Sequence, residues 1–219
     1  FQCSLLDEWK LKECLNICQP DVVYHLAACP LVRPDEKNPN QILQDNIIGT
    51  FNLIHNLKFC PRVVFSSSIT VYGDFSKGKP PNWTTRENPI SVYAATKLAC
   101  ENIINVYTSQ GKIDGTSIRI PALVGLNSTH GLIHDLIRKL TSTSEFLELF
   151  GDEPGTEKPF CCVDEIAQIF HLCAVKHYDY GRLFLAGTTT TATVEQAAVA
   201  VMRGLGIYKR IKWLGKQSV

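Results

Sequence analysis

The chain has 219 residues, a formal net charge of +1, 45% hydrophobic residues and 20% charged residues. This length corresponds to one domain or somewhat more, and the apolar fraction is that of a globular protein, which excludes intrinsic disorder. No apolar run reaches the roughly 18 residues of a membrane span, and the near-neutral charge lacks the basic surface of a nucleic-acid-binding protein.

The nine cysteines are irregularly spaced, and their odd number does not match the paired pattern of a disulfide scaffold. Cys14 and Cys18 lie four residues apart, and Cys161 and Cys162 are neighbours, so neither pair has the CxxC spacing of a zinc site. No histidine follows either pair at ligand distance, and we expect no metal. We interpret the cysteines as reduced thiols of a cytoplasmic protein.

Hydrophobic periodicity predicts an alternation of helices and short strands. In the first half we expect a helix over 8–18 capped by Asp7, a strand over 21–28, a helix from about 40 to 58, a strand over 62–68, a loop over 73–90 and a helix from Ser91 to about 109. In the second half we expect a strand over 116–120 ended by Pro121, a helix near 130–141, a strand over 147–150, a helix over 164–175 and a strand over 182–186. This alternation predicts a doubly wound α/β fold, a parallel sheet covered by helices on both faces.

In an open parallel sheet, ligands bind outside the carboxyl ends of the strands. Tyr93 and Lys97 lie four residues apart in a predicted helix between two such strands, so they share one helical face. A free phenol titrates near 10, and a nearby ammonium lowers that pKa toward the range of a general base. The YxxxK pattern alone is weak, because a tyrosine and a lysine on a helix surface usually have no such role.

Further motifs accompany this pair in a fixed order. The segments 64–73 and 91–97 resemble the extended short-chain dehydrogenase/reductase family, and the 25 positions from Ser68 to Tyr93 match its nucleotide-sugar epimerases. The other segments that resemble the family's motifs are 25–28, 46–50, 119–125, 130–133, 149–152 and 160–164. The resemblance therefore covers nearly the whole chain.

The resemblance implies a site for hydride transfer with NAD as the cofactor. Tyr93 would be the acid/base, Lys97 would bind the nicotinamide ribose and, with the charge of the oxidised nicotinamide, lower the pKa of the phenol, and Ser68 would bond the reacting oxygen. The further residues implied for the cofactor are Ala27, Ala28, Asn46, Ser66 and Pro121, and those implied for the substrate are Thr70, Ala122, Gly131, Leu132 and Lys158. Asn46 has a structural alternative, a hydrogen bond to backbone beside its helix, and the alternative for Pro121 is that it only ends a strand.

The residues after Ser68 separate the reactions known in this family. Its dehydratases place Asp-Glu there, whereas this chain has Ile69 and Thr70, so dehydration is not expected. Residues 66–73 are most similar to the corresponding segment of the UDP-glucose 4-epimerase group. This similarity implies hydride transfer from C4 of a nucleotide sugar and return of the hydride to the other face of a 4-keto sugar. The alternatives are a dehydrogenase or reductase of a non-nucleotide alcohol and a non-catalytic, cofactor-binding regulatory subunit.

The family's glycine-rich pyrophosphate loop has no counterpart here, and we expect it before Phe1. We therefore interpret the chain as a fragment without the N-terminal βαβ unit, and expect it to bind NAD poorly by itself. Residues 1–125 would be a partial Rossmann domain, and 126–219 part of a small substrate domain with returning Rossmann elements. The resemblance implies a homodimer through the helices of Asn46 and Tyr93. His134 and Asp135 could contact substrate, although a solvated helix face is favoured.

Overall fold

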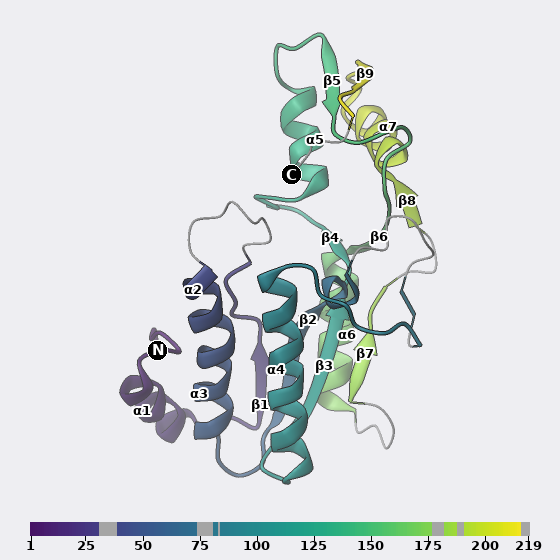
Figure 1. Ribbon diagram of the computed structural model, residues 1–219. Coiled ribbons are helices and arrows are strands. Elements are labelled where there is room, and N and C mark those ends of the chain that lie inside the picture. Colours follow the sequence, from purple (N-terminus) through teal and green to yellow (C-terminus); the bar gives the residue numbers. More distant parts are fainter. Residues whose placement is uncertain (31–38, 74–80, 83, 177–181, 188–190, 216–219) are drawn as a thin grey trace. The chain divides into compact units, whose positions relative to one another are not determined.

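The computed structural model describes residues 1–30, 39–73, 81–82, 84–176, 182–187 and 191–215 (Figure 1). The chain divides into two compact units. The first comprises 1–74, 81–120 and 166–186, and the second comprises 75–80, 121–165 and 187–219.

The first unit is built on a parallel sheet of four strands. These are β1 (Val22–His25), β2 (Arg62–Ser68), β3 (Asp114–Ile120) and β7 (Leu183–Leu185), in the spatial order β1-β2-β3-β7. Across β2 and β3, Ser67 is the register partner of Arg119. The parallel sheet predicted from short apolar strands is confirmed, and β2 has the predicted bounds.

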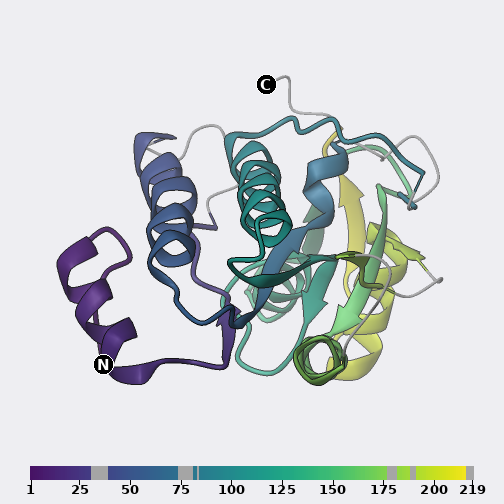
Figure 2. The same ribbon diagram turned by 90° about the horizontal axis from the view of Figure 1, so that it is seen from below.

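Helices cover both faces of this sheet. The helical segments of the first unit are α1 (Glu8–Cys18), α2 (Pro39–Leu43), the π-helical segment η1 (Gln44–Ile48), α3 (Gly49–Asn56), the 3-10 helix η2 (Ile69–Tyr72), α4 (Val92–Ser109) and α6 (Val163–Val175), whose first turn belongs to the second unit. α3 and α4 lie on one face, and α6 lies on the other (Figure 2). The doubly wound arrangement is therefore confirmed.

Local signals explain where the helices begin. The Asp7 side chain accepts a hydrogen bond from Lys10 N, and the Ser91 side chain accepts one from Ala94 N, so both predicted caps are present. The helix expected from about 40 to 58 is instead divided into α2, η1 and α3. Its interruption is a π-helical turn, which apolar periodicity does not reveal.

The core of the first unit lies between β2, α3 and α4. Its fully buried members include Ile54, Phe65 and Ile104. A Cβ at Gly115 of β3 would lie 2.5 Å from the side chains of Ile104 and Thr108, so the glycine allows α4 to pack close to the strand. This close packing determines where α4 presents its side chains.

The second unit combines short strands with two helices. They are β4 (Ala122–Val124), α5 (Leu132–Leu140), β5 (Phe146–Leu149), β6 (Glu157–Cys162), β8 (Thr191–Thr193), α7 (Val194–Leu205) and β9 (Arg210–Trp213). One sheet has the order β4-β6-β8, and β5 pairs in parallel with β9. Leu136, Leu147 and Ala198 are fully buried where α5, β5 and α7 pack together.

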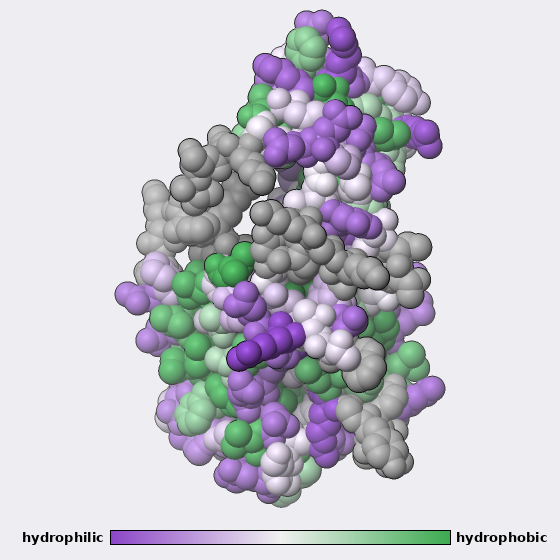
Figure 3. Space-filling view, turned by 45° about the vertical axis from the view of Figure 1, so that its right-hand side comes forward, coloured by the Kyte–Doolittle hydropathy of each residue, from purple (hydrophilic) through white to green (hydrophobic). Residues whose placement is uncertain are grey.

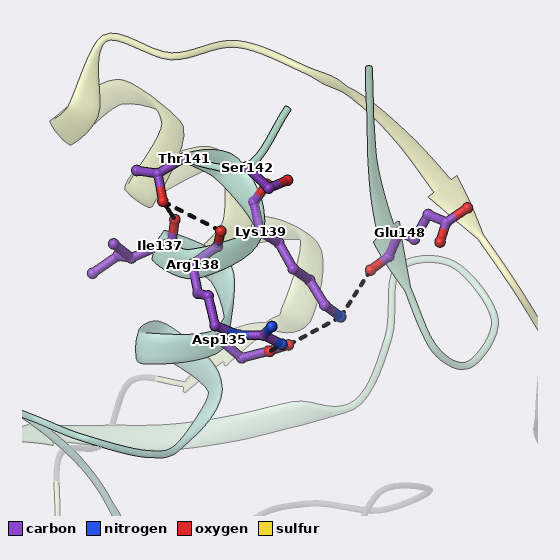
Figure 4. Close-up of polar contacts among 7 residues, drawn as sticks. All are labelled: Asp135, Ile137, Arg138, Lys139, Thr141, Ser142 and Glu148. Carbon is purple, nitrogen blue, oxygen red and sulfur yellow. Dashed lines mark hydrogen bonds and ion pairs between the residues drawn. The ribbon is translucent and has the colours of Figure 1, made fainter. Parts of the chain in front are cut away.

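The polar side of α5 is held by short-range contacts. Asp135 accepts a hydrogen bond from Arg138 at 2.7 Å and pairs with Lys139 Nζ at 3.0 Å. Lys139 Nζ also donates to the carbonyl oxygen of Glu148 at 3.0 Å, which links α5 to β5 (Figure 4). The polar side chains of α5 are thus paired within the helix and with the backbone of β5.

On the face seen in Figure 3, hydrophobic and hydrophilic residues are interspersed. In the part of the chain that the structure describes, no helix combines the length and the apolar character needed to cross a bilayer.

Candidate active site

The carboxyl end of β2 leads directly into a polar cluster. Ser68 is the last residue of the strand and is 8% exposed. Its Oγ accepts hydrogen bonds from Thr70 N at 3.2 Å and from Thr70 Oγ1 at 2.9 Å, so it caps η2. The Ser68 side chain also lies close enough to the phenol of Tyr93 on α4 to lower the pKa of that phenol. The structure thus brings together three residues that sequence analysis assigned to catalysis and substrate binding.

Lys97 lies on the same face of α4, one turn after Tyr93. It is only 3% exposed, and its Nζ donates a hydrogen bond to Ser66 O at 2.7 Å. The ammonium lies 4.8 Å from the centroid of the Phe65 ring and 5.7 Å from that of Tyr93. A buried cation in contact with a phenol ring is therefore present at the end of β2.

Burial changes the protonation equilibria of both side chains. It lowers the pKa of Lys97 to about 8, while Cys100 and Glu101 act in the opposite direction. Burial raises the pKa of Tyr93, and the nearby Ser68 side chain opposes this only in part. In the chain alone burial has the largest effect on the phenol, and the lowering of its pKa by Lys97 together with an oxidised nicotinamide stays a prediction. The charge of an oxidised nicotinamide, one part of that prediction, arrives only with the cofactor.

The hydrogen-bond donors of Lys97 indicate whether these residues could bind a dinucleotide. Within the described ranges, the one hydrogen bond of its Nζ goes to Ser66 O. An ammonium has three N–H donors, so two stay available to hydroxyl groups such as those of a ribose. The donor set therefore fits the role that the family resemblance implies for Lys97.

Asn46 lies in the π-helical segment and is 2% exposed. Its Oδ1 accepts from Cys29 N at 2.7 Å, and its Nδ2 donates to Cys29 O at 3.2 Å and to Thr96 Oγ1 at 2.9 Å. These bonds match the structural alternative, in which Asn46 orders backbone, here the segment after β1. Ala27 and Ala28 precede Cys29 in that segment, exposed and half-buried respectively. Direct contact of these three residues with a cofactor stays a prediction.

His25, at the end of β1, is a buried polar residue to which sequence analysis gave no role of its own. It is 2% exposed, and its Nε2 lies 2.7 Å from Thr50 Oγ1. Burial, with a smaller effect from the charge of Lys97, lowers its pKa to about 4. His25 is therefore neutral at physiological pH.

A buried ion pair lies beside the serines and was also missed. Glu101 of α4 is 7% exposed and Arg119 of β3 is 2% exposed. Arg119 donates through Nε to Glu101 Oε1 at 2.9 Å and through Nη2 to Oε2 at 2.7 Å. Ser67 Oγ donates to the same Oε1, and Glu87 pairs with Arg119 at 2.8 Å. The arginine within the strand predicted over 116–120 was the available signal, because arginine is almost never fully buried unless paired.

The other predicted site residues belong to the second unit. Pro121 is buried, Ala122 begins β4, Gly131 precedes α5 with φ 93°, Leu132 is the first residue of α5, and Lys158 is exposed on β6. Their contacts with a substrate or cofactor stay predictions.

For His134 and Asp135, near the start of α5, the sequence analysis considered contact with substrate and favoured a solvated helix face. The carboxylate of Asp135 is paired with Arg138 and Lys139 of its own helix. Burial acts to raise the pKa of Asp135, but the hydrogen bonds from these two cations lower it overall. This arrangement supports the favoured interpretation, a solvated helix face.

Comparisons with known proteins agree with this arrangement. The model of the NAD dependent epimerase/dehydratase family matches residues 1–187. UDP-glucose 4-epimerase of Mycoplasma genitalium is 28% identical over 78% of this chain and 53% of its own length. D-erythronate dehydrogenase of Haemophilus influenzae is 32% identical over 48% of this chain and 34% of its own length. The chain spans about half the length of the first two curated relatives, at 53% and 54%.

A solved structure extends the likeness over the whole fold. The structure of MoeE5 in complex with UDP-glucose and NAD matches with a TM-score of 0.82 at 25% identity, covering 99% of this chain and 72% of that one. These findings confirm the resemblance to the extended short-chain dehydrogenase/reductase family. Since the family model covers 187 of the 219 residues, the chain belongs to the NAD-dependent epimerase/dehydratase family.

Proposed function

We propose that the protein containing this chain is an NAD-dependent nucleotide-sugar 4-epimerase that interconverts UDP-glucose and UDP-galactose. The observation that carries this proposal is the placement of Tyr93 on one face of α4 with the buried ammonium of Lys97, whose Nζ lies 5.7 Å from the centroid of the Tyr93 ring. The relative from Mycoplasma genitalium, which bears the name UDP-glucose 4-epimerase, supports the choice of reaction. Ile69 and Thr70 support it further, because they provide no acid and base for the elimination of water.

Each residue of this cluster has a defined task in the proposal. Ser68 holds the sugar 4-hydroxyl, and Tyr93 takes its proton during oxidation and returns one during reduction. Lys97 binds the nicotinamide ribose, and its charge stabilises the phenolate. NAD supplies the acceptor, and then the donor, of the hydride at C4 of the sugar. Because burial alone raises the pKa of Tyr93, the proton transfer depends on Lys97 carrying its charge.

The remaining assignments extend the same proposal. Residues 1–125 would hold NAD, with Ala27, Ala28, Asn46, Ser66 and Pro121 shaping its pocket, and 126–219 would contribute to the sugar side. There, the substrate contacts are assigned to Thr70 of the first unit and to Ala122, Gly131, Leu132 and Lys158 of the second. The exposed Lys158 supplies a positive charge for the diphosphate, although without the two-pronged geometry of arginine.

The test compares Tyr93→Phe with the unaltered full-length protein, using conversion of UDP-galactose to UDP-glucose followed by NMR. Removal of the hydroxyl should lower kcat by about 100-fold or more, the usual contribution of a general acid/base. Tyr208→Phe is the matched control, because Tyr208 is 72% exposed, and it should retain activity. Turnover by Tyr93→Phe at the rate of the unaltered protein would contradict the assignment.

A dehydrogenase is the second candidate, favoured by the 32% identity to D-erythronate dehydrogenase of Haemophilus influenzae. The two reactions differ in their use of cofactor. An epimerase regenerates NAD in each cycle, whereas a dehydrogenase accumulates NADH in proportion to product. Absorbance at 340 nm during turnover of UDP-galactose and, separately, of a small hydroxy acid distinguishes them.

We further propose a homodimer in the cytoplasm. Ile48, Phe51 and Val106 are apolar residues of neighbouring helical segments that are 41%, 41% and 50% exposed, and the Phe51 ring packs edge-on against Tyr107 of α4. A second copy would cover this surface. Sedimentation of Phe51→Glu should give a monomer where the unaltered protein gives a dimer. The nine free thiols support the cytoplasm as the compartment.

A further inference from the structure

One carboxylate joins three elements of the first unit. Glu101 Oε1 accepts hydrogen bonds from Ser67 Oγ and from Arg119 Nε, and Oε2 accepts one from Arg119 Nη2. Ser67 and Arg119 are register partners on adjacent strands, so their side chains lie next to each other beneath α4. Glu101 therefore fixes the ends of both β2 and β3 against this helix.

This contact continues a pattern along α4. Tyr93 and Lys97 lie eight and four residues before Glu101, so all three share one helical face. The chain neighbours of Ser67 lie near the first two: the Ser66 carbonyl accepts from Lys97, and the Ser68 side chain lies close enough to the Tyr93 phenol to lower its pKa. Three consecutive residues of β2 thus lie against three side chains on one face of α4. A shift of Ser67 along the helix would displace both other contacts.

The ion pair is well suited to hold this alignment. A bidentate pairing fixes direction as well as distance, and Arg119 is further held by Glu87 at 2.8 Å and by the Tyr72 ring at 4.6 Å from its centroid. A cavity of about 450 Å³ borders the pair, lined among others by Glu87, Glu101 and Arg119. Without these contacts, Glu101 would have room to move away from Ser67.

The charge of Glu101 also acts on the ammonium one turn earlier. The titratable groups around Lys97 are Tyr93, Cys100 and Glu101 of α4 and His25 of β1. Cys100 and Glu101 raise the pKa of Lys97, opposing the effect of burial, and Glu101 is the carboxylate among them. Loss of its charge would favour the neutral amine.

We propose that Glu101 is a positioning residue of the site: through Ser67 and Arg119 it fixes the end of β2 against α4, and with it the Ser66 carbonyl that accepts the hydrogen bond of Lys97. The catalytic consequence rests on the proposed function, whereas the alignment itself does not. Glu101 is predicted to affect turnover without contacting substrate or cofactor.

Three variants of the full-length protein separate positioning from general loosening. Glu101→Gln removes the charge but keeps an acceptor for Ser67, whereas Ser67→Ala removes the hydrogen bond and keeps the charge. Asp114→Asn is the matched control, because Asp114 pairs with Arg62 at 2.7 Å at the opposite end of the same two strands. The measurements are kcat and KM for UDP-galactose, the Lys97 pKa from its ¹⁵Nζ NMR signal, and the ¹³Cζ NMR shift of Tyr93.

Glu101→Gln should lower kcat at least about tenfold with KM changed less than about twofold, and should lower the pKa of Lys97 measurably. Ser67→Ala should lower kcat several-fold and shift the Tyr93 signal, while the pKa of Lys97 stays near that of the unaltered protein. Asp114→Asn should leave kcat, the pKa of Lys97 and the Tyr93 signal unchanged.

The proposal is overturned if Glu101→Gln and Ser67→Ala keep the kcat and both NMR signals of the unaltered protein, or if Asp114→Asn loses as much activity as Glu101→Gln. If Glu101→Gln does not fold, the result for Ser67→Ala tests the proposal by itself, because this variant removes only one hydroxyl. If the unaltered protein does not epimerise UDP-galactose, the proposed function fails, and the two NMR measurements still decide the alignment by themselves.

Discussion

The two ends of the parallel strands in the first unit differ in how deeply they bury polar side chains. At the carboxyl ends, His25, Ser67 and Arg119 are at most 2% exposed. At the amino ends, the side chain of Asp114 is 29% exposed and that of its partner Arg62 is 9% exposed. The ion pair at the amino ends thus keeps its carboxylate nearer to water, with Asp114 at 29% exposure, than the pair at the carboxyl ends, where the Glu101 side chain is 8% exposed.

The difference indicates what each end is for. A solvated charge costs the folded state little free energy, whereas a buried charge is tolerated only with well-placed partners. The carboxyl end is also where open α/β sheets bind ligands. We infer that the buried polar groups at this end reduce the stability of the fold in exchange for chemical function. Four predictions test this contrast, from the largest expected effect to the smallest.

The largest effect is expected for Arg119→Leu. This change leaves the buried Glu101 and its neighbour Glu87 without their shared cation, and breaking a buried pair costs about 3–5 kcal/mol. Urea unfolding at pH 7 measures the loss. A destabilisation below about 1 kcal/mol would place this pair with surface ion pairs and remove the contrast between the two ends.

The second prediction concerns acid pH and His25. Its pKa is 6.5 as the reference value and about 4 when folded, so below pH 6.5 the unfolded chain binds a proton that the folded chain does not. Stability should therefore fall by roughly 3 kcal/mol as the pH decreases from 6.5 to 4. Urea unfolding across this range measures the slope. His25→Gln should flatten it, and an unchanged slope would mean that other groups cause the loss.

The third prediction is a gain in stability. The pKa of Lys97 is about 8 in the fold against a reference of 10.5, so the charged form is disfavoured by burial at neutral pH. Lys97→Met should raise stability at pH 7 by about 1–2 kcal/mol, since the lost hydrogen bond to Ser66 offsets part of the gain. The unaltered protein should also become more stable between pH 8 and 10.5, and the variant should not. A destabilised variant would contradict the cost assigned to this lysine.

The smallest effect is expected at the amino ends. Asp114→Asn removes the charge that pairs with Arg62, and also a contact at 3.5 Å with Arg182, whose side chain is 52% exposed. The loss should be less than about 1 kcal/mol and should shrink further in high salt. Unfolding at two ionic strengths measures it. A loss as large as that of Arg119→Leu would show that the two ends do not differ.

Short-range signals made much of the fold predictable. Asp7 and Ser91 act through hydrogen bonds within three residues, so the starts of α1 and α4 could be located from the sequence. The three-residue strands β4 and β8 are too short to show a period, and β9 is defined by its pairing with β5. The start of α7 had a usable signal, because Thr193 and Gln196 form a capping box.

The candidate site was predictable to the extent that it depends on spacing. Tyr93 and Lys97 share a face because they lie four residues apart in one helix. The direction of the Tyr93 pKa depends on burial, which spacing does not reveal. The contact of Ser67 and Arg119 with Glu101 depends on the register of β2 and β3, so it required the assembled sheet.

The chain order of the sheet has a consequence for biosynthesis. β3 ends at Ile120, but its outer neighbour β7 begins only at Leu183, so the nascent chain leaves the ribosome with β3 as an open edge. Until Ala186 emerges, the backbone oxygen of Arg119 lacks the amide that it bonds in the finished protein. Open edges invite pairing with other chains, and a charge within the strand discourages it. Arg119 would thus reduce aggregation of the nascent chain before its ion pair contributes to the folded protein.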